Sequence, residues 1–134
     1  MAGPTTIEQF RQIALFADLN DTDLGRICSE AWDFRLVPGD VLFHEGDPGD
    51  RAFVVTEGQL EIRKMTDRNE MLIAVRGEGE IIGEMALLQS EPRSATVIAR
   101  TPAHLISIPK AALDDLLSSS PDAARSVFTR LISR

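Results

Sequence analysis

The stretch Gly83-Glu84-Met85-Ala86-Leu87-Leu88, followed after a four-residue spacer by Arg93-Ser94-Ala95-Thr96, carries the strongest signal in this chain. It places a glycine-led turn, a carboxylate and a helix-competent run just before an arginine that enters an apolar, β-like segment. Free N–H groups at the start of a short helix favour an anion, and an arginine fork donates two parallel hydrogen bonds to phosphate oxygens. An ionised glutamate only accepts hydrogen bonds, which suits a sugar hydroxyl. The stretch therefore predicts a small ligand that carries both groups.

The region around this stretch, residues 32–108, consists of short β-like runs separated by turns that contain glycine. The runs are residues 33–37, 41–43, 52–56, 60–64, 71–76, 94–99 and 104–108. Short strands at regular spacing with turn residues between them predict an all-β barrel or sandwich. Turns that need a positive φ account for the glycines at 39, 46, 49 and 58, so these glycines do not require a ligand.

Helices are predicted on both sides of this β region. Apolar residues from Ile7 to Ala17 recur at helical spacing, with Thr6 as a candidate cap, and a second helix follows with Asp21 or Thr22 as its cap. After the β region, Pro109 is suited to begin a helix that buries Ala112, Leu113, Leu116 and Leu117. Residues 118–122 break this helix, and a last apolar stripe continues to Ile132. We therefore expect the chain to stop inside a longer element, as part of a larger protein, with a naturally short protein as the alternative.

Composition excludes several classes of protein. A length of 134 residues with 43% hydrophobic and 26% charged residues predicts one soluble globular domain. The sequence has neither a run of about 20 apolar residues that would cross a bilayer nor a secretory signal. The lone Cys28 cannot form an internal disulfide, and its place on an apolar helical face predicts a buried structural thiol. A cytoplasmic location without membrane insertion is the resulting expectation.

The net charge of −7 and the lack of a cluster of basic residues predict that the chain does not bind nucleic acid directly. No set of residues predicts catalysis or a metal site. His44 and His104 lie 60 residues apart, whereas a cupin-type metal site needs two or more histidines near a carboxylate. The chain is therefore not expected to be an enzyme.

The order of helices, about eight strands and further helices resembles the cyclic nucleotide-binding domain, and the resemblance covers nearly the whole chain. Its phosphate-binding cassette reads roughly Phe-Gly-Glu-x-Ala-Leu-Leu, a spacer, and Pro-Arg-Ser/Ala/Thr-Ala-Thr, and Ile82 stands where the family often has an aromatic residue. Residues 37–50 and 52–62 are similar to the strand-turn motifs of the family. The resemblance implies a mainly β fold with flanking α elements: an eight-stranded, jelly-roll-like β-roll (32–108) between N-terminal helices (5–31) and C-terminal helices (109–134), as one domain over 1–134.

The resemblance also implies a role for each cassette residue. Glu84 would accept a hydrogen bond from the ribose 2′-hydroxyl, Arg93 would bind the cyclic phosphate, and Ser94 would donate to the phosphate or the base. Backbone amides near Gly83, Met85 and Ala86 would complete the cradle. Apolar contact with ring atoms would come from Ile82 and from the strand around Ile73 and Val75. The alternative for Arg93 is a surface ion pair with Glu84 or Glu91, and Met85, Leu87 and Leu88 are expected to be core residues.

The sequence thus predicts a regulatory module that binds a cyclic mononucleotide, with cAMP as the first choice and cGMP as the alternative. No cofactor is implied apart from this ligand. By the resemblance, ligand binding would move the C-terminal helices and signal to an attached effector or partner protein of unknown identity. Two alternatives stay open: an interaction module that keeps the fold without binding nucleotide, and the sensor half of a transcription regulator similar to the catabolite activator family.

Overall fold

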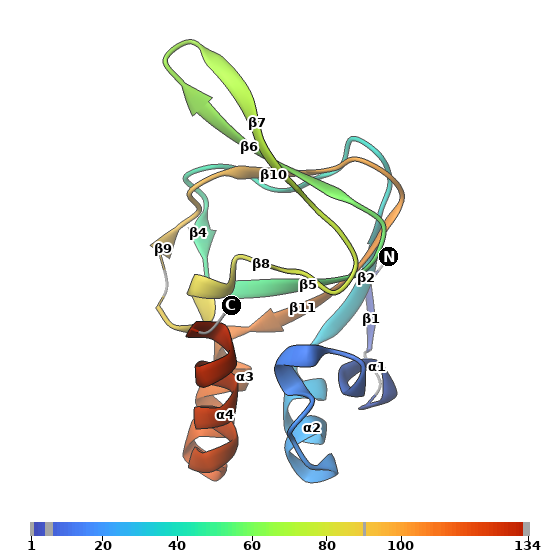
Figure 1. Cartoon of the computed structure of the whole chain (residues 1–134), viewed down its shortest axis with the longest axis vertical. Coiled ribbons are helices and arrows are strands. Elements are labelled where there is room, and N and C mark those ends of the chain that lie inside the picture. Colours follow the sequence, from blue (N-terminus) through green and yellow to red (C-terminus); the bar gives the residue numbers. More distant parts are fainter. Residues whose placement is uncertain (1, 5–6, 90, 133–134) are drawn as a thin grey trace.

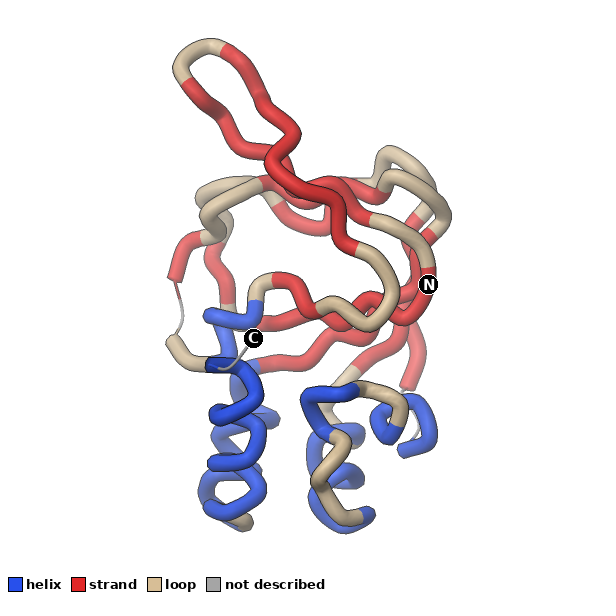
Figure 2. Tube along the Cα trace, viewed as in Figure 1, coloured by secondary structure: helices blue, strands red, loops and turns tan. Residues whose placement is uncertain are grey.

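The computed structural model describes residues 2–4, 7–89 and 91–132 as a β-roll with helices packed against one end (Figures 1 and 2). The strands are β1 (Ala2–Pro4), β2 (Trp32–Leu36), β3 (Val41–Phe43), β4 (Pro48–Gly49), β5 (Arg51–Glu57), β6 (Leu60–Thr66), β7 (Asn69–Arg76), β8 (Ile81–Ile82), β9 (Glu91–Pro92), β10 (Thr96–Ala99) and β11 (Ala103–Pro109). One antiparallel sheet has the order β1-β2-β11-β5-β8, a second has β3-β10-β6-β7, and β4 pairs with β9. The predicted fold class is confirmed.

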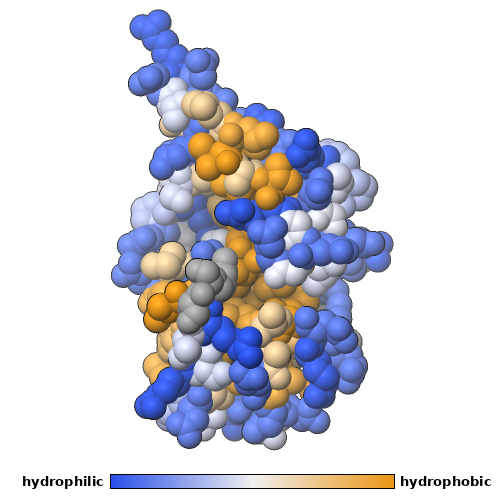
Figure 3. Space-filling view, in the orientation of Figure 1, coloured by the Kyte–Doolittle hydropathy of each residue, from blue (hydrophilic) through white to orange (hydrophobic). Residues whose placement is uncertain are grey.

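All seven predicted strands are present, with ends shifted by a few residues. The sequence missed the short strands β1, β4, β8 and β9, because two or three residues cannot show an alternating pattern. The β6–β7 hairpin projects from the body of the roll (Figure 1), and Figure 3 shows that its tip is hydrophilic and its base hydrophobic. A register shift between Ile62 and Arg63 leaves Ile73 of β7 without a partner, which is a β-bulge.

The core lies in two parts because β5 is buried on both faces. Successive side chains of a strand point to opposite faces of the sheet. Ala52 and Val54 therefore pack in a cluster with the helices, whereas Phe53 and Val55 pack inside the roll. The apolar run of β5 thus joins the helical layer to the interior of the roll.

The N-terminal helices differ in detail from the prediction. The single helix expected from Ile7 to Ala17 is instead α1 (Ile7–Arg11) followed by a 3₁₀ turn, η1 (Ala14–Phe16). The backbone of Ile13 is extended between them, and the break lets the buried rings of Phe10 and Phe16 approach to 5.3 Å between centroids. The second helix, α2 (Asp21–Cys28), is capped by Asn20, whose side chain accepts from the Asp23 N–H; the predicted caps Asp21 and Thr22 were wrong. The proposed cap Thr6 lies outside the described residues.

The C-terminal helices follow the prediction closely. Pro109 is the N-cap of α3 (Lys110–Ser119), and α4 (Pro121–Ile132) begins after a break at Ser120. Leu117 was predicted to be buried, but it is exposed, as is Ile132. Cys28 is half-buried against the helical core, and burial raises the pKa of its thiol. Within the described residues, no helix combines the length and apolar character needed to cross a membrane.

Candidate functional site

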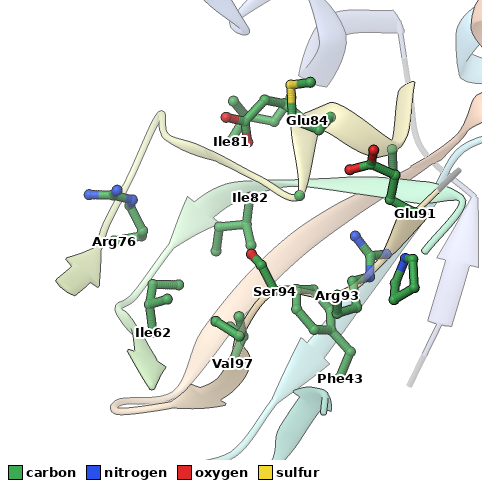
Figure 4. Close-up of a pocket in the computed structure, with 15 residues that line it drawn as sticks. Phe43, Ile62, Arg76, Ile81, Ile82, Glu84, Glu91, Arg93, Ser94 and Val97 are labelled. Carbon is green, nitrogen blue, oxygen red and sulfur yellow. The ribbon is translucent and has the colours of Figure 1, made fainter. Parts of the chain in front are cut away.

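A cavity of about 320 Å³ opens between the cassette and the interior of the roll (Figure 4). It is lined by all seven residues that the sequence singled out: Ile82, Gly83, Glu84, Met85, Ala86, Arg93 and Ser94. Its other lining residues are Phe43, Ile62, Arg76, Ile81, Glu91, Pro92, Ala95 and Val97. The volume is in the range of small-molecule sites, which combine an apolar lining with a few polar groups.

Arg93 is the buried charge of this cavity, with 9% of its surface exposed. Its Nη2 donates to the backbone oxygen of Arg51 at 2.8 Å, and its guanidinium carbon lies 4.2 Å from the centroid of the Phe43 ring. Its Nε is buried and has no hydrogen-bond partner among the described residues. Burying a charge is costly unless it is paired and hydrogen-bonded. The site therefore holds a cation whose hydrogen-bonding capacity is only partly used.

No carboxylate of the described residues lies within ion-pair distance of Arg93. The alternative of a surface ion pair with Glu84 or Glu91 is therefore wrong, and the arginine is not at the surface. Burial lowers the pKa of Arg93, and the more distant charges of Asp50 and Asp47 act in the opposite direction. The guanidinium nevertheless stays protonated, because its ordinary pKa is far above neutral pH.

Two glycines leave the space that the Arg93 side chain occupies. Gly83 has a φ of 70°, in the left-handed region, and a Cβ there would collide with Nη1 of Arg93. A Cβ on Gly49 would lie 2.9 Å from Nε of Arg93 and 2.8 Å from the backbone oxygen of Glu91. Gly49 does not have a positive φ, so the turn explanation predicted for it was wrong. Close approach of the Arg93 side chain is the reason for this glycine.

The cassette helix is a single 3₁₀ turn, η2 (Glu84–Leu87), with Gly83 as its N-cap. The N–H of Ala86 donates to the oxygen of Gly83 at 3.1 Å, so this amide is already used inside the turn. Glu84 lines the cavity and is half-buried. Ala86 and Leu87 are buried and Leu88 packs against the core, but Met85 is half-exposed at the cavity instead of being a core residue.

The apolar wall of the cavity comes from strands other than the one predicted. Ile62 of β6 and Val97 of β10 are paired across the sheet and both line the cavity. Ile73 and Val75, which were expected to contact the ligand ring, do not line it, and Ile73 is 56% exposed. The bulge at Ile73 breaks the alternation on which that expectation depended. The alternation of apolar and polar residues at 60–62 and 95–97 is the sequence pattern that identifies the two strands of this wall.

Two neighbouring carbonyl groups connect the cavity to α3. The oxygen of Arg51 accepts from Arg93, and the oxygen of Asp50 accepts from the N–H of Lys110 at 2.8 Å, where α3 begins. The side chain of Arg51 also donates to Ser107 of β11 at 3.1 Å. The Arg93 end of the cavity and the start of α3 are thus joined through two adjacent residues, Asp50 and Arg51.

The two histidines lie apart from this cavity. His44 is exposed near Asp47, and Nε2 of His104 lies 2.8 Å from Oδ1 of Asp33. Among the described residues, no three His, Cys, Asp or Glu side chains are grouped so that they could hold a metal ion.

Solved structures with the same architecture include the N-terminal domain of a transcriptional regulator from Streptomyces coelicolor. It is 37% identical with a TM-score of 0.79, and the match covers 92% of this chain and 87% of that one. A cyclic nucleotide-binding domain from Methylobacillus flagellatus is 30% identical with a TM-score of 0.80, over 95% of this chain and 72% of that one.

Among curated proteins, a cyclic nucleotide-gated potassium channel of Mesorhizobium japonicum is 44% identical over 91 residues, which cover 67% of this chain and 24% of the channel. A second such channel, from Rhizobium etli, is 36% identical over 101 residues, or 75% of this chain and 27% of that protein. This chain therefore spans about a quarter of the length of these relatives. The family model of the cyclic nucleotide-binding domain matches residues 34–120, and the chain belongs to this family.

Proposed function

We propose that this chain is a sensor domain that binds a cyclic mononucleotide in the cavity between η2 and the roll. The observation that carries the proposal is Arg93, which is buried, has no carboxylate partner among the described residues and has an Nε without a hydrogen bond. A cyclic phosphate would supply the missing negative charge and accept two parallel hydrogen bonds from the guanidinium.

The other polar residues of the cavity suit the rest of such a ligand. Glu84 would accept from the ribose 2′-hydroxyl, and Ser94 would donate to the phosphate or the base. Ile82, together with Ile62 and Val97, would contact the apolar faces of the sugar and base. Backbone N–H groups near Gly83 and Met85 would contribute to the cradle, whereas the Ala86 N–H would first have to leave the Gly83 oxygen.

Signalling would proceed through the backbone link between Arg93, residues 50–51 and α3. A ligand changes the conformation of a protein only by its difference in affinity for two states. If phosphate binding draws Arg93 away from the Arg51 oxygen, the adjacent Asp50 carbonyl and its bond to Lys110 are affected as well. We propose that α3 and α4 pass this change to an effector, in a cytoplasmic, non-catalytic regulatory domain that spans residues 1–134.

The nature of the effector is open to two classes of relative. The match to potassium channels favours a gating module, and the match to the N-terminal domain of a transcriptional regulator favours the sensor half of such a protein. The cassette residues bind phosphate and ribose, which cAMP and cGMP share. The sequence favoured cAMP.

The test is calorimetric titration of the nucleotide-free chain with cAMP and cGMP, using Arg93→Ala and, as control, the exposed hairpin residue in Arg68→Ala. Loss of a hydrogen bond to a charged group costs about 1.5–3 kcal/mol, so Arg93→Ala should weaken binding roughly 10- to 150-fold. Arg68→Ala should bind as the wild type does. If neither nucleotide binds to folded wild-type protein, or if Arg93→Ala keeps full affinity, the proposal is wrong and an interaction module becomes the better description.

A further inference from the structure

A second arginine, outside the cassette, lines the same cavity. Arg76 is the last residue of β7, and Figure 4 shows it and Arg93 on opposite sides of the cavity. Between them lies an apolar wall made of Ile62, Ile82 and Val97. A cyclic nucleotide whose phosphate is at Arg93 would therefore extend along this wall, with its base toward Arg76.

Arg76 is held loosely by one neighbouring carboxylate. Its Nη1 lies 3.7 Å from Oε2 of Glu80, and both side chains are nearly half-exposed. The other oxygen of Glu80, Oε1, accepts from the N–H of Gly77 at 2.9 Å, which fixes the carboxylate in the turn after β7. Such an exposed ion pair contributes little to stability. The guanidinium is thus kept at the rim of the cavity and can turn toward a ligand at little cost.

The charged and hydroxyl groups of the cavity are unevenly distributed. Glu84, Glu91, Arg93 and Ser94 all belong to the cassette, whereas Arg76 is the one charged side chain that β6, β7 and β10 contribute to the described cavity lining. At the base end, the ligand would meet a fork of N–H donors and an aliphatic wall. The base that fits is one with acceptors on its exposed edge.

Guanine and adenine differ on this edge. Guanine presents two acceptors, N7 and O6, which match the two parallel N–H groups of an arginine. Adenine presents the N7 acceptor beside the N6 amino group, a donor that would face the donors of the guanidinium. We propose that Arg76 reads the N7/O6 edge of the base, so that this domain prefers cGMP to cAMP. The inference rests on the proposed function and reverses the choice of base favoured by the sequence.

The experiment is calorimetric titration with cGMP, cAMP and inosine 3′,5′-cyclic monophosphate, which keeps N7 and O6 and lacks the 2-amino group. A bidentate contact of this kind discriminates between bases by roughly 5- to 150-fold. Because Arg76 is partly exposed, we expect a preference of about tenfold for cGMP. The inosine nucleotide should bind within about threefold of cGMP, since it offers the same two acceptors.

Three variants separate this role from a general effect of charge. Arg76→Ala should remove the preference by weakening cGMP and leaving cAMP nearly unchanged. Arg76→Lys keeps the charge without the fork and should lose most of the preference. Arg68→Ala, at the exposed tip of the same hairpin, should behave as the wild type does.

The outcomes are distinguishable from failure of the proposed function. If cyclic nucleotides bind but cAMP binds as tightly as cGMP, the inference is wrong and the proposed function stands. The same holds if the inosine nucleotide binds with the affinity of cAMP and not of cGMP, or if Arg76→Ala lowers the affinity for all three nucleotides equally. If none of the three binds, both the inference and the proposed function are overturned.

Discussion

The substitution Gly49→Ala tests whether the position of the Arg93 guanidinium, and not only its presence, determines affinity. Gly49 does not line the cavity, so its replacement leaves the proposed ligand contacts chemically intact. The new Cβ would lie 2.9 Å from Nε and 3.0 Å from Cζ of Arg93, and 2.8 Å from the oxygen of Glu91. Ordinary contacts between such atoms lie near 3.5–4.0 Å, so the guanidinium has to move by roughly 0.5–1 Å.

The magnitude follows from these contacts. Inserting a methyl group into a packed site costs about 1–3 kcal/mol of unfolding free energy, which lowers the Tm by roughly 4 °C or more. Displacement of the Arg93 guanidinium should remove at least one charge-assisted hydrogen bond to the phosphate, which would weaken the affinity by roughly tenfold or more. Gly25→Ala is the matched control, because a Cβ there meets only Ile7 at 3.9 Å and alanine favours the helix.

The assay is a double-mutant cycle in which the affinity for cGMP is measured calorimetrically and the Tm by thermal unfolding. In the Arg93→Ala background, Gly49→Ala should no longer reduce affinity, since no guanidinium is left to displace. Wild-type affinity in the single Gly49→Ala variant would refute the reasoning. An equal loss of affinity with and without Arg93 would also refute it, because the effect would then come from the backbone of β9.

Two further predictions concern carboxylates. Glu91 lines the cavity at the Arg93 end, and its Oε1 accepts from the side chain of Gln89 at 2.7 Å. Because Gln89 is neutral, it does not cancel the negative charge of Glu91, which would repel the proposed phosphate. Glu91→Gln should therefore tighten nucleotide binding about threefold at low salt, and an unchanged or weaker affinity would contradict this. Burial raises the pKa of Glu30, and a hydrogen bond with Asp115 and the negative charge of Asp115 act in the same direction. Stability is therefore lost as the pH rises from the unfolded-state pKa through the folded-state pKa of Glu30. Glu30→Gln should raise the Tm at pH 7 by about 2 °C or more, and by less at pH 4. Equal gains at both pH values would contradict the raised pKa of Glu30.

The cassette could be predicted from the sequence because its residues are contiguous. Gly83, Glu84 and Arg93 lie within eleven positions, and one turn and one short strand bring them together. The surroundings of Arg93 could not be predicted in the same way. Gly49 reaches it through the pairing of β4 with β9, two-residue strands with no pattern of their own, and Phe43 lies near it through the pairing of β3 with β10.

The larger elements could be predicted where the periodicity of apolar residues is regular, and the predictions were wrong where the structure interrupts that periodicity. The double-sided burial of β5 appears in the sequence as an unbroken apolar run, and α4 as a clear helical stripe. The extended backbone at Ile13 interrupts a regular helical pattern and allows the contact between Phe10 and Phe16. The local sequence contains no turn or breaker residue that would predict this interruption. The bulge at Ile73 likewise follows from the pairing of β7 with β6.

The neighbouring carbonyls of residues 50 and 51 have a consequence for how this domain tolerates change. Both hydrogen bonds, to the Lys110 N–H and to Arg93, use main-chain oxygens, which every amino acid possesses. Substitution of the Asp50 or Arg51 side chain therefore leaves both acceptors in place. The link between ligand cavity and α3 is thus robust to mutation, and related chains can diverge at these two positions while keeping the same connection. A scan that truncates side chains would pass over it, and only a change to the peptide group itself would expose it.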